Sequence, residues 1–266
     1  MGFKLLTVPA GAGLQWVLAG LQEMRRHPLA YGGIMAVAFA LLMVLGSLPV
    51  IGPPMMLASV PLLNLAFMMA VHASRQGHKP GAGVFLAPWV APGTERRQRL
   101  LALCGAYMAA SMVAVLLGSW VDGGAMARLM DAMASDDASP ETVDSLMQAP
   151  GLLAGLLVRL GLTVLVSVPF WHAPALIVWA DQGVAQSLFS STLAMARAWP
   201  AFTLYGLGWV VVLGVAGSLI SALTGLLQLG SLGVLVLLPL MTLMVSAYYV
   251  SQYHTFVGCF VVREQE

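Results

Sequence analysis

One short segment concentrates the residue types that can do chemistry inside an apolar chain. Pro169-Phe170-Trp171-His172-Ala173-Pro174 places a histidine between two prolines. Prolines five residues apart leave backbone carbonyls without helical partners. His172 could donate to such a carbonyl as a core residue does, or it could act as a proton-relay or ligand group. The segment is therefore the first candidate for a buried polar site.

Three further polar residues lie in apolar surroundings. Arg159 stands early in the same apolar segment, where its side chain could snorkel to the outer interface or pair with an outer-loop carboxylate. We expect the Asn64 side chain to form a hydrogen bond with a neighbouring helix rather than to contact a substrate. His254 follows a cluster of tyrosines typical of a membrane interface. The candidate intramembrane polar site therefore consists of His172, Arg159, Asn64 and His254.

Motifs for common catalytic chemistry are absent from the sequence. It contains no P-loop, no Gly-x-Ser-x-Gly and no His-Glu-x-x-His, and neither Cys104 nor Cys259 has a CxxC partner. His72 and His78 lack a third ligand for zinc. We therefore expect no catalytic, cofactor-binding or metal-binding residues and no enzymatic activity. A net charge of +1 gives no indication of nucleic-acid binding.

The elements that position these residues follow from the composition. Of the 266 residues, 59% are hydrophobic and only 9% are charged. Soluble domains carry about 25% charged residues. The chain is therefore expected to be a membrane protein.

Charge-free runs locate the membrane spans. None of the four charged residue types occurs from Leu29 to Ser74 or from Ala198 to Val262. A spanning helix needs about 20 apolar residues, so each run holds two helices and a turn. Prolines 49, 53 and 54 break the first run, and a turn at Gln228–Gly233 breaks the second. The six predicted spans are 29–48, 55–74, 100–121, 151–180, 201–227 and 232–253, and the fourth is kinked by its prolines.

Basic residues indicate the orientation of the six spans. Ten of the 12 lysines and arginines fall on one side of this arrangement. The positive-inside rule places that side, with both termini, in the cytoplasm of a bacterium, so the spans cross its inner (plasma) membrane. We predict an all-α polytopic membrane helix bundle that forms a single membrane domain. Its parts are residues 1–28 as a cytoplasmic or interfacial N-terminal helix, 29–121 as spans 1–3, 122–150 as an acidic periplasmic loop, 151–262 as spans 4–6 and 263–266 as a cytoplasmic tail.

The acidic loop contains two patterns of amphipathic helices. Met126, Leu129, Met130 and Met133 recur at helical spacing, and Ser139-Pro140-Glu141 is typical of a helix start. Val143, Leu146 and Met147 would form the buried face of the second helix. Either the loop rests as a small cap on the outer surface, or it docks a partner or cation.

Two segments of the chain resemble each other. Each is an amphipathic helix that ends in arginine and is followed by a proline, Pro28 or Pro200, at the start of a span. Such helices can lie in the interface plane before spans one and five. Stripes of small residues in spans three (Ala106 to Gly118) and five (Gly217 to Gly225) predict close helix packing.

Three strings carry a resemblance to a known family. They are Gly13-Leu14-Gln15-Trp16-Val17, Phe170-Trp171-His172-Ala173-Pro174-Ala175-Leu176 and Ala201-Phe202-Thr203-Leu204-Tyr205-Gly206. In these the chain resembles a family of uncharacterised bacterial six-span inner-membrane proteins. The resemblance implies a helical fold in a bacterial inner membrane and carries over no catalytic or binding residue.

Two functions are compatible with these features. The first is a non-enzymatic scaffold or accessory subunit that binds membrane lipids or another membrane protein. The alternative is a small-solute or lipid transporter with a site near Pro169–Pro174. A water-filled cavity that reaches the polar residues would favour transport, and a dry, well-packed interior would favour the scaffold.

Overall fold

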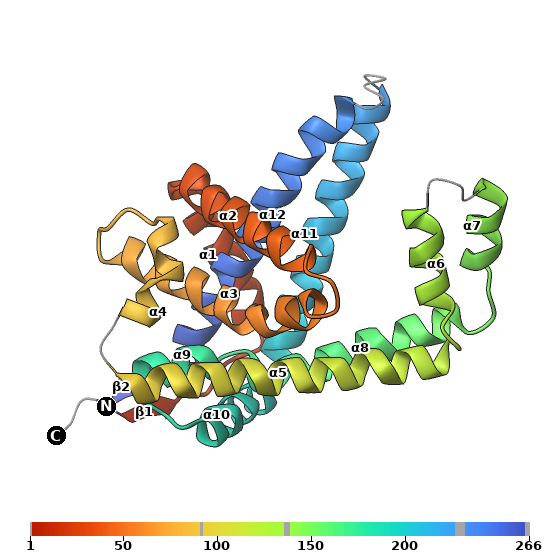
Figure 1. Ribbon diagram of the computed structural model, residues 1–266. Helices are drawn as coiled ribbons and strands as arrows, with labels where there is room; N and C mark the ends of the chain where they lie inside the picture. Colours follow the sequence, from red (N-terminus) through yellow and green to blue (C-terminus); the bar gives the residue numbers. More distant parts are fainter. Residues whose placement is uncertain (1, 91–92, 136–138, 227–231, 264–266) are drawn as a thin grey trace.

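The computed structural model describes residues 2–90, 93–135, 139–226 and 232–263. Helices dominate the chain, and its two ends form short strands (Figure 1). The elements in chain order are β1 (Gly2–Leu5), α1 (Ala12–Arg26), α2 (Pro28–Gly46), α3 (Gly52–Arg75), the 3₁₀ helix η1 (Ala82–Phe85), α4 (Ala87–Val90), α5 (Thr94–Val121), α6 (Ala125–Ala134), α7 (Pro140–Met147), α8 (Leu152–Phe170), α9 (Ala173–Ala180), α10 (Val184–Arg197), α11 (Trp199–Leu226), α12 (Leu232–Cys259) and β2 (Phe260–Arg263).

The molecule is an all-α polytopic helix bundle. Among the described residues, five stretches are long and apolar enough to cross a membrane: Pro28–Gly46, Gly52–Arg75, Thr94–Val121, Leu152–Ala180 and Trp199–Leu226. They match the first five predicted spans. The helix α12 corresponds to the predicted sixth span. Residues 227–231, which end the predicted fifth span and begin the predicted turn, lie outside the described residues.

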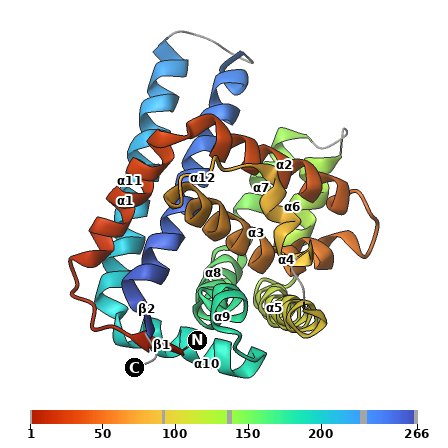
Figure 2. The same cartoon turned by 90° about the vertical axis from the view of Figure 1, so that its left-hand side faces the viewer.

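Pairs of long helices meet at one end and point in different directions at the other. The pair α5–α8 lies side by side along its length, while α11 and α12 extend away from it (Figure 1). Their near ends gather around β1, β2 and α10 (Figure 2). Aromatic and aliphatic side chains fill this junction, among them Trp16, Tyr31, Phe67 and Trp209. The far halves of the helices leave apolar side chains exposed, which only a lipid environment or a partner can cover.

The helix α1 packs against both α11 and α12 instead of lying only on a membrane surface. Small residues allow the close approach: Gly13 faces the backbone of Ala201, and Gly20 faces Ser251. A Cβ atom at either glycine would overlap these neighbours. Trp16 lies between the two glycines and is buried against Gly258. The sequence predicted the amphipathic helix but not the partners of its apolar face.

The two ends of the chain pair as an antiparallel two-stranded sheet. Lys4 lies opposite Val261, and Leu5 lies opposite Phe260. The sequence analysis did not predict these strands. Because β1 precedes the first long helix and β2 follows the last, their pairing holds the two ends of the bundle together.

One predicted span boundary needs correction. The third span begins at Thr94, six residues earlier than predicted, because the polar turn with Glu95 and Arg99 joins the helix and forms an i, i+4 ion pair. The fourth span has its predicted irregularity at the prolines, where the helix is interrupted: α8 ends at Phe170 and α9 begins at Ala173.

The two small-residue stripes behave differently. In α5, Gly118 lies directly against the Arg159 side chain of α8. In α11, a Cβ atom built on Gly217 or Gly225 would meet no described atom within 4 Å. The predicted close packing is therefore present for the third span, and the described residues place nothing against these glycines of the fifth.

The acidic segment forms the two predicted helices, α6 and α7. Ser139 caps α7 by accepting a hydrogen bond from the Thr142 backbone N–H at 3.2 Å. The two helices project beyond the end of the α5–α8 pair (Figure 1). The predicted buried face of α7 is wrong in part, because Met147 is exposed and Val143 and Leu146 are only half-buried.

Candidate functional site

The break between α8 and α9 is the first element of the candidate site. Pro174 lacks the N–H that would reach the Phe170 carbonyl, and Pro169 lacks the one that would reach Leu165. The ladder of backbone hydrogen bonds is therefore interrupted around Trp171 and His172. Polar backbone groups exposed by such a break need partners inside a membrane, where water does not supply them.

Two side chains from other helices supply these partners. The Ser191 hydroxyl on α10 accepts from the His172 backbone N–H at 3.1 Å and donates to the Val168 carbonyl at 3.0 Å. The Asn64 amide on α3 donates from Nδ2 to the Trp171 carbonyl at 2.8 Å. Asn64 thus makes the interhelical hydrogen bond expected of it. Together, Ser191 and Asn64 tie two helices, α10 and α3, to the broken span.

His172 is fully buried beside the break. Its Nε2 lies 3.1 Å from the hydroxyl oxygen of Thr255, which donates to the Gln252 carbonyl at 2.7 Å. Because the one hydroxyl proton of Thr255 is used there, His172 Nε2 carries a proton and donates. The rings of Phe202, Phe256 and Phe260 surround the imidazole at centroid distances of 5.4–5.9 Å. The histidine therefore occupies an aromatic enclosure, as a core residue does.

A pocket opens on the other side of the break. It encloses about 150 Å³, and Asn64 and Trp171 contribute to its wall. Tyr248, Tyr249 and Gln252 of α12 also line it. His172 is not among its lining residues. The predicted site near the proline segment therefore contains a pocket, but Asn64 rather than His172 faces it.

Arg159 lies in the first half of α8, about 20 Å along the helix from His172 at 1.5 Å per residue. Its guanidinium donates to the Asp122 carboxylate at 2.6 Å and to the Ser119 hydroxyl at 3.0 Å. Gly118 and Gly155 leave room for this pair between α5 and α8. Of the two predicted arrangements, the structure shows pairing with a carboxylate at the start of the outer loop.

Asp122 predicts a pH dependence of stability. The Arg159 hydrogen bond holds the pKa of this carboxyl below its ordinary value of 3.8. A lowered folded-state pKa contributes stability above pH 3.8, and that contribution is lost as the pH falls through the folded-state pKa. We expect the apparent melting temperature to fall more steeply below about pH 4 for the natural protein than for Asp122→Asn. Thermal unfolding followed by circular dichroism measures this, and parallel pH profiles would contradict it.

A buried carboxylate that the sequence analysis did not single out lies on α1. Glu23 is only 2% exposed and accepts hydrogen bonds from the Ser74 hydroxyl at 2.6 Å and the Tyr31 hydroxyl at 3.0 Å. Arg26 lies 3.5 Å from its second oxygen. The sequence contains an indication of this site, because Glu23 is the only acidic residue before Glu95. It joins α1 to α2 and α3.

His254 is buried on α12 rather than exposed at an interface. Its ring lies 5.8 Å from that of Tyr253, and among the described residues its Nε2 has no hydrogen-bond partner. The structure thus brings Asn64 to the break beside His172, while Arg159 pairs with Asp122 farther along α8. The four predicted residues do not form one cluster.

Long apolar helices joined at a packed junction define the class of this chain, a polytopic helical membrane protein. The chain is 31% identical over 263 residues to a probable inner membrane protein of Burkholderia thailandensis, and the match covers 98% of this chain and 95% of that protein. The chain therefore belongs to the family of this probable inner membrane protein, which confirms the resemblance. No family model matches the chain, and no solved structure matches it.

Proposed function

We propose that the protein is a non-enzymatic scaffold or accessory subunit of the inner membrane that binds phospholipid. A single observation carries the proposal: an apolar groove lies between α2, α3 and the segment η1–α4. The buried polar groups described above support a structural role for the interior, because Arg159, Asn64 and Ser191 are each bonded to protein groups.

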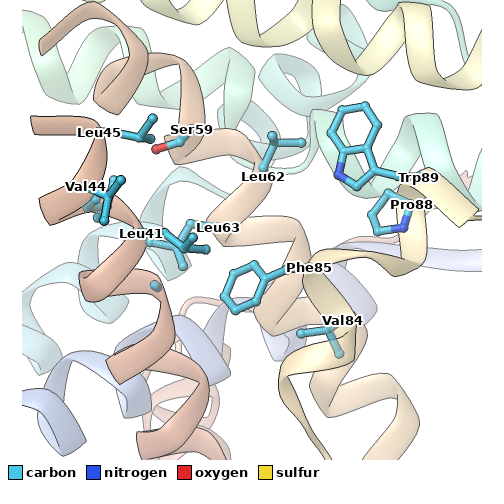
Figure 3. Close-up of a pocket in the computed structure, with 12 residues that line it drawn as sticks. Leu41, Val44, Leu45, Ser59, Leu62, Leu63, Val84, Phe85, Pro88 and Trp89 are labelled. Atoms are coloured by element: carbon cyan, nitrogen blue, oxygen red, sulfur yellow. The ribbon is translucent and has the colours of Figure 1, made fainter. Parts of the chain in front are cut away.

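The groove is apolar on nearly every side (Figure 3). It encloses about 290 Å³, and Leu41 and Leu45 of α2 face Leu62 and Leu63 of α3 across it. The segment between α3 and α5 folds back to close it, bringing Phe85 and other side chains against the middle of α3. Ser59 supplies the one hydroxyl among the described lining residues, and that hydroxyl donates to the Met56 carbonyl at 2.7 Å.

An acyl chain of an anionic phospholipid fits this chemistry. An apolar groove whose described lining carries no charged residue suits hydrocarbon. The closing segment lies in the chain between Lys79 and Arg96, and residues 75–99 carry five basic residues against Glu95 alone. Basic clusters next to membrane spans attract anionic headgroups, at about 1 kcal/mol per residue near the surface.

Native mass spectrometry of the protein extracted gently from its membrane tests this function. We expect a retained phospholipid, and we expect Phe85→Ala to reduce its occupancy several-fold because the ring closes the groove. Leu86→Ala is the matched control, because Leu86 is exposed on the same segment and outside the groove lining. Loss of occupancy in both variants, or a co-purified protein with no lipid, would contradict a lipid occupant.

The proposal includes six spans with both termini in the cytoplasm. The pairing of β1 with β2 supports an even number of crossings, since both ends of the chain lie together. Single cysteines at Lys79 and Met133 are then expected to label from opposite sides of the membrane. Labelling of both from the periplasm would contradict six spans.

A second candidate function is transport of a small solute. The observation that favours it is the broken fourth span, since discontinuous helices line the binding sites of many transporters. The pocket beside Trp171 lies at this break. Flux into proteoliposomes tests it, and flux that is unchanged by replacing Asn64 would argue against a transport site here.

A further inference from the structure

The pocket at the break holds two hydrogen-bond acceptors without partners. Asn64 Nδ2 is committed to the Trp171 carbonyl, which fixes the orientation of the amide and leaves Oδ1 free. Among the described residues, neither Asn64 Oδ1 nor Gln252 Oε1 has a hydrogen-bond partner. Both side chains are more than nine-tenths buried and both line the pocket. Buried acceptors of this kind call for a donor.

Aromatic rings form most of the remaining wall. Trp171 stands at 88° to Tyr248, with ring centroids 6.3 Å apart, and Tyr248 stands at 82° to Tyr249 at 5.6 Å. The rings of Trp171, Tyr248 and Tyr249 contribute aromatic surface to the wall of the pocket. Such aromatic cages attract ammonium groups through cation–π interactions.

The lack of charged side chains in the described lining narrows the class of ligand. Among the described residues, the pocket's lining contains no lysine, arginine or histidine to pair with an anion and no carboxylate to coordinate a divalent metal. We propose that this pocket binds a primary ammonium group, supplied either by a free amine or by an ethanolamine lipid headgroup. The amide oxygens accept its N–H bonds, and the rings stabilise its charge. The volume of about 150 Å³ accommodates a small amine.

Saturation-transfer NMR on the whole protein in phosphatidylcholine nanodiscs tests the proposal with methylammonium. We expect saturable transfer to methylammonium and at least tenfold weaker binding of methanol, a neutral donor of similar size. Gln252→Glu is expected to tighten methylammonium binding about tenfold, because a carboxylate attracts the cation. Gln252→Leu is expected to weaken it at least tenfold. The same changes at Gln76, which is exposed at the end of α3, serve as matched controls.

The outcomes test whether the pocket binds an ammonium group, which molecule supplies that group, and whether the lipid groove is a separate site. Three results would overturn the proposal. The first is that methylammonium shows no saturable binding to the unaltered protein, and the second is that methanol binds to it as tightly as methylammonium does. The third result is that changes at Gln76 alter methylammonium binding as much as those at Gln252. Loss of methylammonium binding in phosphatidylethanolamine nanodiscs would assign the site to the headgroup, and retained binding would assign it to a free amine. Occupancy of the Phe85 groove is measured separately by mass spectrometry, so either proposal can fail alone.

Discussion

Replacing Ser191 with alanine is expected to destabilise the protein by about 3 kcal/mol. The hydroxyl bonds two backbone groups on either side of the helix break, the His172 N–H and the Val168 carbonyl. The change would leave both groups buried without a partner, and each such group costs about 1–3 kcal/mol. Reversible unfolding in mixed micelles, followed by far-ultraviolet circular dichroism, measures the loss.

The neighbouring residue provides the control for this experiment. Ser190→Ala removes the same hydroxyl from the same helix, and the structure gives Ser190 no hydrogen bond through that hydroxyl. We expect Ser190→Ala to change the free energy of unfolding by less than about 0.5 kcal/mol. Equal stability of the two variants would mean that the break does not depend on Ser191.

The sequence predicts the break itself but not the residues that support it. Pro169 and Pro174 mark the position at which backbone hydrogen bonds are lost, and the structure interrupts the helix between them. Ser191 and Asn64 lie 19 and 108 residues from His172 in the chain, on separate helices. No local pattern relates such positions, because tertiary packing alone brings them together. The same limit applies to Asp122, which the sequence indicates only as one of several outer-loop carboxylates.

The segment between the second and third spans shows a different limit. Its basic residues flank an apolar centre and place the segment on the cytoplasmic side of the predicted arrangement. In the structure that centre, which includes Phe85 and Trp89, folds back against α2 and α3. The absence of charge from Gly81 to Val90 was visible in the sequence. Periodicity cannot locate a segment of this length, since it completes too few helical turns.

Glu23→Leu is expected to cost about 3 kcal/mol of stability and to loosen α1 from the helices it joins. The change would leave the buried hydroxyls of Tyr31 and Ser74 without their shared acceptor. Glu23 continues the face of α1 that carries Trp16 and Gly20, so its position fixes that face against α2 and α3 as well as α12. Unfolding in mixed micelles measures the stability, and hydrogen exchange of residues 12–26 measures the release of α1.

Two further variants separate the carboxylate's charge from its role as an acceptor. Glu23→Gln keeps an oxygen that can accept from both hydroxyls and loses only the charge near Arg26, so we expect a cost of about 1 kcal/mol. Glu95→Gln is the matched control at an exposed glutamate, whose ion pair with Arg99 is worth at most about 1 kcal/mol. If Glu23→Gln is as damaging as Glu23→Leu, the charge itself holds α1 in place. If Glu23→Leu is as mild as the Glu95 control, α1 is held by its glycine contacts with α11 and α12, and the buried carboxylate is not needed for the fold.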